Sequence, residues 1–189
     1  MLKIEAKIML KGKVIVLGVC GGVAAYWSVE IVGQLKNMNA DVHVIMTENA
    51  TKFVTPLTFQ TISQNTVTVN MFVKHNSQEC IHISLAKRAD FLLVAPATAN
   101  IIGKVSNGIA DDALSTTIMA TAAPVIFCPA MNDKMWANKI VQENVNKLKE
   151  HGYHFVAPEY GKMACGDKGV GRLAKIESIV DKLIEIDKG

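Results

Sequence analysis

Short apolar runs alternate with helical patterns along almost the whole chain, and this alternation is the strongest constraint on its fold. Strand-like runs occupy residues 14–19, 41–46, 91–95, 125–128 and 153–157. Helical periodicity covers residues 23–38, 111–122, 134–151 and 175–187. The last three strand-like runs each stop at a proline, which cannot donate a hydrogen bond to a ladder. Strands that alternate with helices predict a three-layer α/β fold, in which helices cover both faces of a parallel sheet.

The pattern predicts one domain over residues 1–189, because no repeat, linker or low-complexity segment divides the chain. Residues 158–173 are the least regular stretch and are rich in glycine and polar residues. A loop of this length usually has a function, so we expect a mobile flap here.

Charge and cysteine content exclude several classes of protein. With 20 basic and 17 acidic residues, the formal charge of +3 is too small to indicate a nucleic-acid or polybasic membrane partner. The longest apolar stretch is too short and too polar to span a bilayer. The four cysteines lie far apart without zinc-ligand spacing, which predicts no metal site and a reducing, cytoplasmic compartment.

The predicted strand ends carry small, hydroxyl or amide residues. They read Gly18–Gly22, Met46–Asn49, Ala95–Asn100 and Pro129–Asn132. Ligands of open α/β sheets bind outside the carboxyl ends of the strands, and this rim suits a phosphate-bearing planar cofactor. The glycine turn matches neither the GxGxxG motif nor the P-loop motif. The alternative that it is a tight turn that binds no ligand therefore remains. Thr98 and Asn132 could equally be helix caps.

Two further residues are candidates for chemistry. His82 lies between two isoleucines, a setting more typical of a buried structural histidine than of a catalytic one. Cys165 lies among glycines in the 158–173 loop, either as a thiol on a flap or as an incidental residue. Cys20, Cys80 and Cys128 lie in or beside apolar runs and are expected in the core.

The ordered set of motifs in this chain indicates a protein family more specifically than any single motif does. GGVAAY (21–26), HISLAKRAD (82–90), APATAN (95–100), GIADD (108–112), PAMNDKMW (129–136) and ACGDKGVGRL (164–173) occur in this order. The set resembles the homo-oligomeric flavin-containing cysteine decarboxylases, and within them the members that act in coenzyme A biosynthesis. The resemblance covers roughly residues 13–180.

The resemblance implies a Rossmann-like (flavodoxin-like) fold that holds FMN, and it assigns roles to individual residues. The catalytic residues would be His82 and Cys165, the latter as the acid that protonates the intermediate. The loop around Cys165 would close over the substrate as a clamp. The implied cofactor-binding residues are Gly21, Gly22, Val23, Thr47, Thr98, Ala99, Asn100, Ala130 and Met131. The implied substrate-binding residues are Asn132, which would bind the substrate carboxylate, and Met135, Ala164, Gly166 and Lys87.

The implied reaction is the FMN-dependent oxidative decarboxylation of 4′-phosphopantothenoylcysteine to 4′-phosphopantetheine. It would pass through a thioaldehyde and an enethiolate that the flavin re-reduces, because the thioaldehyde accepts the electrons released with CO2. Family members form trimers and often dodecamers. In many bacteria the domain is fused to a ligase that makes the substrate, so the chain is expected to be a stand-alone decarboxylase or the first half of a bifunctional protein.

Alternatives within the same family stay open. One is a peptidyl-cysteine decarboxylase, against which the ACGDKGVGR segment argues. The other is a non-catalytic flavoprotein or regulatory paralogue, although such proteins tend to carry acidic tails that this chain lacks. The chain departs from the family pattern at Trp27, where lysine is common, and at Leu173, where methionine is commoner.

Overall fold

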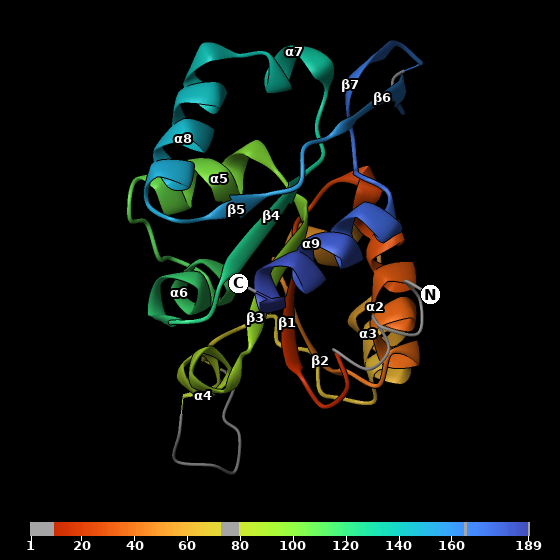
Figure 1. The fold of residues 1–189 in the computed structure, drawn as a ribbon, viewed down its shortest axis with the longest axis vertical. Coiled ribbons are helices and arrows are strands. Elements are labelled where there is room, and N and C mark those ends of the chain that lie inside the picture. The colour runs from red at the N-terminus through yellow and green to blue at the C-terminus, as the bar shows by residue number, and fades with distance from the viewer. Residues whose placement is uncertain (1–9, 73–79, 165, 189) are drawn as a thin grey trace.

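The computed structural model describes residues 10–72, 80–164 and 166–188. Its centre is a parallel sheet of five strands in the order β2-β1-β3-β4-β5 (Figure 1). The strands are β1 (Val14–Val19), β2 (Asp41–Met46), β3 (Phe91–Ala97), β4 (Val125–Pro129) and β5 (His154–Phe155). The predicted three-layer α/β fold with a parallel sheet is therefore confirmed.

Helices cover both faces of the sheet (Figure 1). One face packs against α2 (Trp27–Asn37), α3 (Pro56–Ser63) and α9 (Ile176–Lys188). The other packs against α4 (Ile81–Arg88), α5 (Ala99–Ser106), α6 (Ala113–Ala120) and α8 (Lys139–Glu150). Shorter helical turns are η1 (Val23–Tyr26), η2 (Ala50–Lys52) and α7 (Asp133–Trp136).

Side-chain alternation along the strands explains the two cores. On β1, Ile15 and Leu17 join the core beneath α2, whereas Val16 joins the core beneath α5 and α6. Cys20, directly after β1, joins the same core as Val16. Every residue of β3 is buried. A strand buried on both faces reads as an unbroken apolar run, which is why these segments are conspicuous in the sequence.

Strand β3 does not stop at Pro96 as predicted but continues to Ala97. Its register with β4 shifts between Val94 and Ala97, so the proline falls where the ladder is irregular and no N–H donor is required. In the same way β4 includes Pro129, which pairs with Ala97. The predicted strand 153–157 is reduced to His154 and Phe155.

Several helix predictions also need correction. The predicted helix 134–151 is two helices, because Asn138 caps α8 by accepting a hydrogen bond from the Ile140 N–H at 3.0 Å. The predicted helix 23–38 begins with the 3-10 turn η1, and the predicted helix 111–122 is shorter, with Asp112 as its cap. Helix α3 was not predicted. It begins at Pro56, whose fixed φ suits a first helical position.

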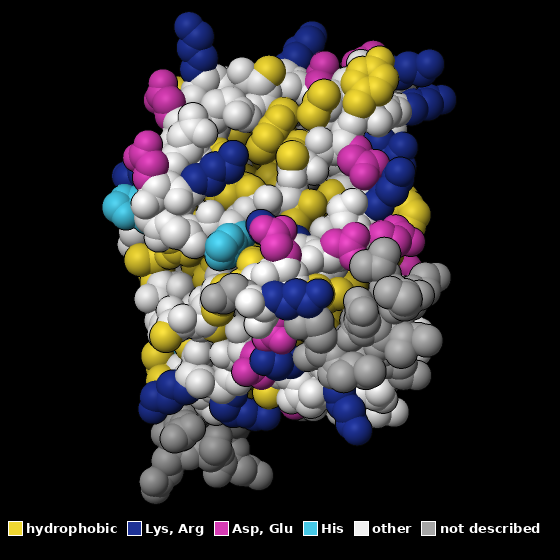
Figure 2. Space-filling model, viewed as in Figure 1, with side chains coloured by type: hydrophobic (Ala, Val, Ile, Leu, Met, Phe, Trp, Pro, Cys, Tyr) yellow, Lys and Arg dark blue, Asp and Glu magenta, His cyan; other side chains and the backbone are white. Residues whose placement is uncertain are grey.

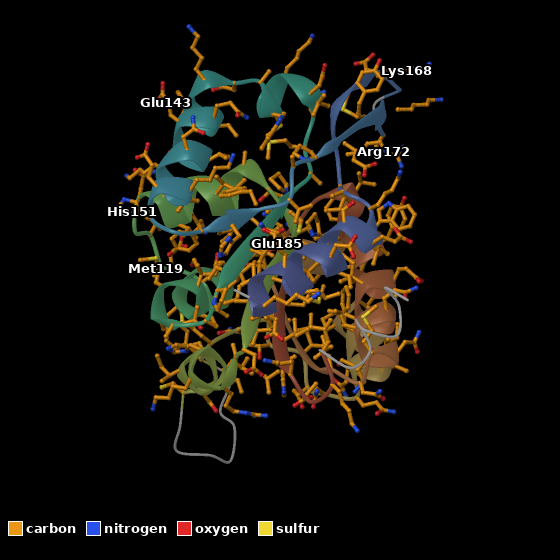
Figure 3. The ribbon with its side chains drawn as sticks, viewed as in Figure 1. Met119, Glu143, His151, Lys168, Arg172 and Glu185 are labelled. Carbon is orange, nitrogen blue, oxygen red and sulfur yellow. The ribbon has the colours of Figure 1, made fainter. Side chains whose placement is uncertain are left out.

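The stretch 158–173, predicted to be an irregular loop, contains an antiparallel hairpin. Its strands are β6 (Glu159–Lys162) and β7 (Lys168–Arg172). Lys168 and Arg172, labelled in Figure 3, bound β7 at the tip and the base of the hairpin. The hairpin projects from the top of the molecule beside α7 (Figure 1).

Charged side chains are scattered over the visible face, with basic and acidic residues interspersed (Figure 2). No helix in the described ranges is long and apolar enough to cross a membrane. Within the same residues, no group of three or more His, Cys, Asp or Glu side chains could hold a metal ion.

We predict that Phe127→Ala lowers the free energy of unfolding by about 3–5 kcal/mol, because a fully buried aromatic side chain leaves a cavity. The ring of Phe127 packs against Phe155 at a centroid distance of 5.3 Å and against Tyr153 at 5.9 Å. Urea denaturation measures the change. The matched control is Phe72→Ala, whose side chain is 82% exposed and whose loss should change stability by less than about 0.5 kcal/mol. Equal effects of the two substitutions would contradict the packing argument.

Candidate functional site

A cavity of about 460 Å³ lies where the carboxyl ends of β1, β2 and β3 meet. Two backbone hydrogen bonds hold these ends together: Thr47 N–H donates to the Val19 carbonyl at 3.0 Å, and Cys20 N–H donates to the Pro96 carbonyl at 3.3 Å. The lining residues are Cys20, Gly21, Thr47, Glu48, Asn49, Thr98, Ala99, Asn100, Ile101, Lys104, Asp112 and Met135. Three of the four predicted strand ends therefore meet at one cavity, whereas Pro129–Asn132 is not among its lining residues. The space is of the size that small ligands occupy.

In the glycine turn after β1, close packing requires a glycine at Gly21. A Cβ added at Gly21 would clash with the Cβ of Asn49 and lie 2.7 Å from the Asn49 carbonyl carbon. A Cβ at Gly22 would meet only a methyl group of Thr98, at 3.8 Å. Gly21 thus lets the loop after β1 lie against the loop after β2, which closes one wall of the cavity.

The first turn of α5 supplies hydrogen-bond donors to the cavity. Thr98 is the N-cap residue, as the capping alternative proposed, but among the described residues its side chain makes no capping hydrogen bond. The first N–H groups of a helix have no partner within the helix, and Ala99, Asn100 and Ile101 all line the cavity. This wall therefore offers N–H groups and the positive end of a helix dipole to an acceptor or an anion.

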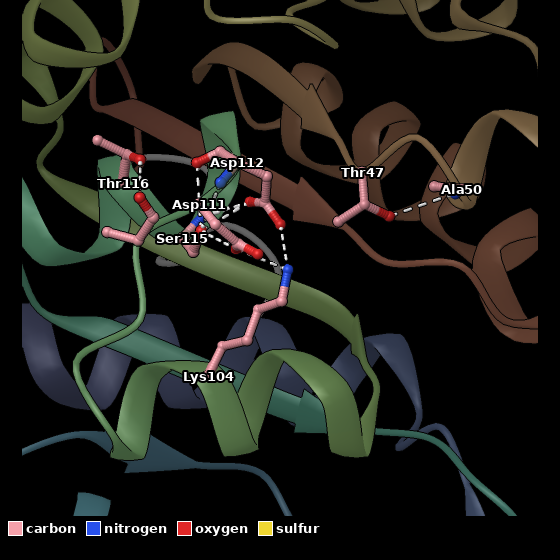
Figure 4. Close-up of polar contacts among 8 residues, drawn as sticks. Thr47, Ala50, Lys104, Asp111, Asp112, Ser115 and Thr116 are labelled. Carbon is pink, nitrogen blue, oxygen red and sulfur yellow. Dashed lines mark hydrogen bonds and ion pairs between the residues drawn. The ribbon is translucent and has the colours of Figure 1, made fainter.

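An ion-pair cluster forms a second wall (Figure 4). Lys104 Nζ lies 2.7 Å from Asp111 Oδ1 and 3.0 Å from Asp112 Oδ2. Asp112 also caps α6, since its Oδ1 accepts the Ser115 N–H at 2.8 Å. Burial opposes the charge of both Lys104 and Asp112. The hydrogen bonds outweigh burial, so the pKa of Lys104 is raised and the pKa of Asp112 is lowered.

Cys20 differs from the expectation of a plain core residue because it is buried and also lines the cavity. Burial raises the pKa of its thiol to about 12, so the group is a protonated, unreactive wall residue at neutral pH. Cys128 is buried as expected, but Cys80 is exposed at the start of α4, and its prediction as a core residue was wrong.

Five of the nine residues assigned to the cofactor lie together in the cavity wall: Gly21, Thr47, Thr98, Ala99 and Asn100. The other four are not among the lining residues. Gly22 and Val23 follow directly in the turn, and the Ala130 N–H donates to the Ala97 carbonyl at 3.0 Å, one residue before Thr98. Met131 N–H donates to the Gly171 carbonyl of the hairpin at 3.0 Å.

The residues assigned to the substrate are divided between places. Met135 lines the cavity. Asn132 precedes α7, and its side chain accepts the Lys134 N–H at 3.0 Å, so the capping alternative is confirmed. Ala164 and Gly166 lie at the exposed tip of the hairpin, and Cys165 between them lies outside the described residues.

The hairpin packs closely on the segment that carries Asn132. A Cβ at Gly169 would lie 2.6 Å from the Cβ of Asp133, and one at Gly171 would clash with the Met131 carbonyl. These two glycines let β7 lie directly against α7. A second, more open hollow of about 420 Å³ lies here, lined by Asp133, Trp136, Ala137, Gln142 and Val170. Hydrophobic side chains gather over this part of the visible face (Figure 2).

Helix α4 carries His82 and Lys87, and neither residue lines the cavity of this chain. Lys87 lies near the amino ends of the strands, whereas the cavity lies at their carboxyl ends. The next residue, Arg88, is 3.7 Å from Asp41, the first residue of β2. His82 lies in the first turn of α4. Its Nδ1 is buried and has no hydrogen-bond partner in the part of the chain that the structure describes.

Sequence reasoning missed Lys104, Asp112 and Ile101 as wall residues. It included Glu48 and Asn49 in the predicted rim, as part of the strand end Met46–Asn49, but gave them no individual role. A signal for Lys104 exists, because a spacing of four residues places it on the same helix face as Asn100. Asp112 lies in the GIADD motif, which carries an acidic pair directly before an apolar helical run.

We predict that Gly21→Ala destabilises the protein by about 1–3 kcal/mol, because the added methyl group displaces the loop that carries Asn49. Gly22→Ala is the matched control and should change stability little, since its Cβ makes an ordinary contact and its φ of −156° is extended. Urea denaturation of the two variants gives the comparison. If Gly22→Ala is the more damaging change, the packing role of Gly21 is wrong.

The relatives of this chain in sequence include a bifunctional protein of coenzyme A biosynthesis and a probable decarboxylase. It is 49% identical over 173 residues to the coenzyme A biosynthesis bifunctional protein CoaBC of Borreliella burgdorferi, with 91% of this chain and 44% of that protein covered. The chain thus spans less than half the length of that relative. It is 40% identical over 175 residues to a probable phosphopantothenoylcysteine decarboxylase of Streptococcus mutans, with 92% of this chain and 98% of that protein covered.

Solved structures show the same fold. A cysteine-to-serine mutant of PPC decarboxylase, complexed with pantothenoylaminoethenethiol, matches with a TM-score of 0.84 and 26% identity over 95% of this chain and all of that one (100%). The FMN-dependent cysteine decarboxylase SpaF matches with a TM-score of 0.82 and 28% identity over 96% of this chain and 99% of that one.

The family model described as Flavoprotein matches residues 3–186, which is nearly the whole chain and includes every wall of the cavity. On this match, and on the relatives above, the chain belongs to the Flavoprotein family.

Proposed function

We propose that this chain decarboxylates 4′-phosphopantothenoylcysteine to 4′-phosphopantetheine with FMN as its cofactor, as a step of coenzyme A biosynthesis. The observation that carries the proposal is the cavity at the ends of β1, β2 and β3, whose wall contains five residues that the sequence motifs assign to the flavin. The relatives named for this reaction or for its pathway support the choice of substrate.

The cavity suits FMN in size and in chemistry. Its volume of about 460 Å³ lies within the range of cofactor sites. The N–H groups of the α5 first turn, the Thr47 hydroxyl and the side chains of Asn49 and Asn100 supply donors for a phosphate, a ribityl chain or ring carbonyls. When bound, the flavin supplies the two-electron chemistry that makes loss of CO2 possible.

The protein's own part in the reaction is to bind and orient the substrate and to supply a proton. Met135 places α7 at the cavity, and Asn132 stands at the start of that helix, where its amide would receive the substrate carboxylate. The hairpin of β6 and β7 rests on this segment through Gly169 and Gly171. We assign to the Cys165 thiol the proton that completes the product, and to the hairpin the exclusion of water.

The proposal places His82 in the active site of a second copy of the chain. His82 does not line the cavity of its own chain, although the motifs assign it to the catalytic site. A homotrimer, or a dodecamer of four trimers, in which α4 of one copy meets the cavity of another would bring it there. The buried, unpartnered Nδ1 would then leave Nε2 as the atom available to the substrate.

The proposal also includes a ligase partner and a compartment. The bifunctional relatives support association with a phosphopantothenoylcysteine ligase, either on the same chain or on another. A reducing, cytoplasmic location agrees with the free thiols of Cys20, Cys80 and Cys128.

The first prediction from this proposal is that the purified protein is yellow with bound FMN and releases CO2 from 4′-phosphopantothenoylcysteine. Product formation is followed by mass spectrometry, with a cysteine-terminated peptide as the competing substrate. Turnover of the peptide alone would replace the proposed substrate by a peptidyl one. A protein that cannot be loaded with FMN would refute the proposal altogether.

The second prediction is that Cys165→Ser still releases CO2 but accumulates the enethiol, with the rate of phosphopantetheine formation reduced by on the order of 100-fold or more, as for loss of a general acid. Cys128→Ala is the matched control and should keep its activity, since Cys128 is buried in β4 and is not among the lining residues of the cavity. Normal product formation by Cys165→Ser would remove the proton-donor role.

The third prediction concerns the assembly. His82→Asn and Asn132→Ala should each be inactive alone, but mixed oligomers of the two should recover part of the activity, because some sites combine an intact His82 with an intact Asn132 from different copies. Activity is measured after co-expression and separation of the mixed species. If the mixed oligomers recover no activity, each site takes His82 and Asn132 from the same copy and the proposed assembly is wrong.

A further inference from the structure

The cavity wall has a charge arrangement that the assigned residues do not explain. Its charged lining residues are Lys104, Asp112 and Glu48. Lys104 is the cation among them, and its Nζ bonds to both Asp112 and Asp111 (Figure 4). The side chains of Lys104 and Asp112 are 20% and 30% exposed, so water screens this pair only partly, whereas Glu48 is exposed.

Both members of the pair are held at the cavity by the fold. Lys104 follows Asn100 by one helical turn on α5, and Asn100 also lines the cavity. Asp112 is fixed as the N-cap of α6 through the Ser115 N–H, and the Ser115 hydroxyl accepts the Asp112 N–H at 3.1 Å in return. The carboxylate of Asp112 would therefore stay in place without Lys104, and asparagine could keep the cap without the charge.

The two charges also influence Cys20, another lining residue of the same cavity. Burial is the largest influence on the pKa of the Cys20 thiol and raises it, and hydrogen bonding with Thr98 lowers it. Of the two charged groups, Asp112 raises this pKa and Lys104 lowers it. Cys20 directly follows β1. Because Lys104 and Asp112 both line the cavity, a ligand bound there lies close to both charges of the pair.

We propose that the Lys104–Asp112 pair sets the reduction potential and the affinity of the flavin held in this cavity, an inference that rests on the proposed function. The oxidised isoalloxazine ring is neutral, whereas the reduced ring loses a proton near neutral pH and is negative. A nearby cation therefore favours the reduced form and a nearby anion opposes it. A cofactor that accepts electrons and returns them within one turnover needs neither form strongly favoured, and an ion pair provides such a balanced environment.

The test compares two neutralising variants that remove opposite charges. Lys104→Met leaves the carboxylates of Asp111 and Asp112 without their cation, so it should lower the midpoint potential of bound FMN and weaken FMN binding by on the order of tenfold. Asp112→Asn keeps the cap and frees Lys104, so it should raise the potential and tighten binding by roughly threefold. Spectroelectrochemistry gives the potential, and quenching of FMN fluorescence gives the dissociation constant.

Two controls separate charge from damage to the fold. Asp111→Asn removes a carboxylate that is 57% exposed and outside the cavity lining, so its shifts should be smaller than those of Asp112→Asn. Lys13→Met breaks an ion pair of similar length, 2.7 Å to Asp187, away from the cavity, and should shift neither quantity.

Opposite shifts for Lys104→Met and Asp112→Asn support the proposal, because mere structural damage would weaken binding in both. Shifts in the same direction, or unchanged potentials in a protein that binds FMN and turns over substrate, overturn this inference and leave the proposed function standing. A wild-type protein that binds no FMN overturns both.

Discussion

The structure depends on a parallel ladder whose strands are buried on both faces. Because helices cover each side of β1, β3 and β4, these strands can carry only apolar or small side chains along their length. The polar groups that these strands contribute are therefore confined to the strand ends. The hydrogen bonds from Thr47 to Val19 and from Cys20 to Pro96 then bring three of those ends to one point. The pairing of the strands therefore determines where the cavity lies, independently of the side chains that line it.

The same constraint separates what the sequence could predict from what it could not. Periodicity identified every strand of the main sheet, because burial on both faces produces apolar runs. Periodicity misplaced helix boundaries where a single polar contact ends or begins a helix. At Asn138, for example, a side-chain cap divides one predicted helix into two. Periodicity also missed the hairpin of β6 and β7, since glycines that allow close packing on Met131 and Asp133 look like loop residues in a sequence.

The site was predictable in the same uneven way. Residues that directly follow a strand, such as Thr47 and Thr98, could be placed from the sequence because parallel strands end at one edge. Lys104 and Asp112 reach the cavity from within a helix and from a helix start, so only their tertiary contact reveals them. His82 shows the opposite case: a motif assigns it to the site, yet the fold of a single chain keeps α4 away from the cavity lining.

The chemistry of the cavity explains why Lys104, the one cation among its described lining residues, is already paired. A phosphate can be held by N–H groups at the start of α5 without a lysine, since such groups are fixed donors with no helical partner. Lys104 is thus not required as an anion ligand, and its two carboxylate partners offset its charge. A free lysine at this position would bind an anionic cofactor more tightly, but it would also favour one redox state over the other. Pairing Lys104 with a helix cap that is itself fixed by Ser115 lets the wall stay close to neutral while its geometry stays rigid.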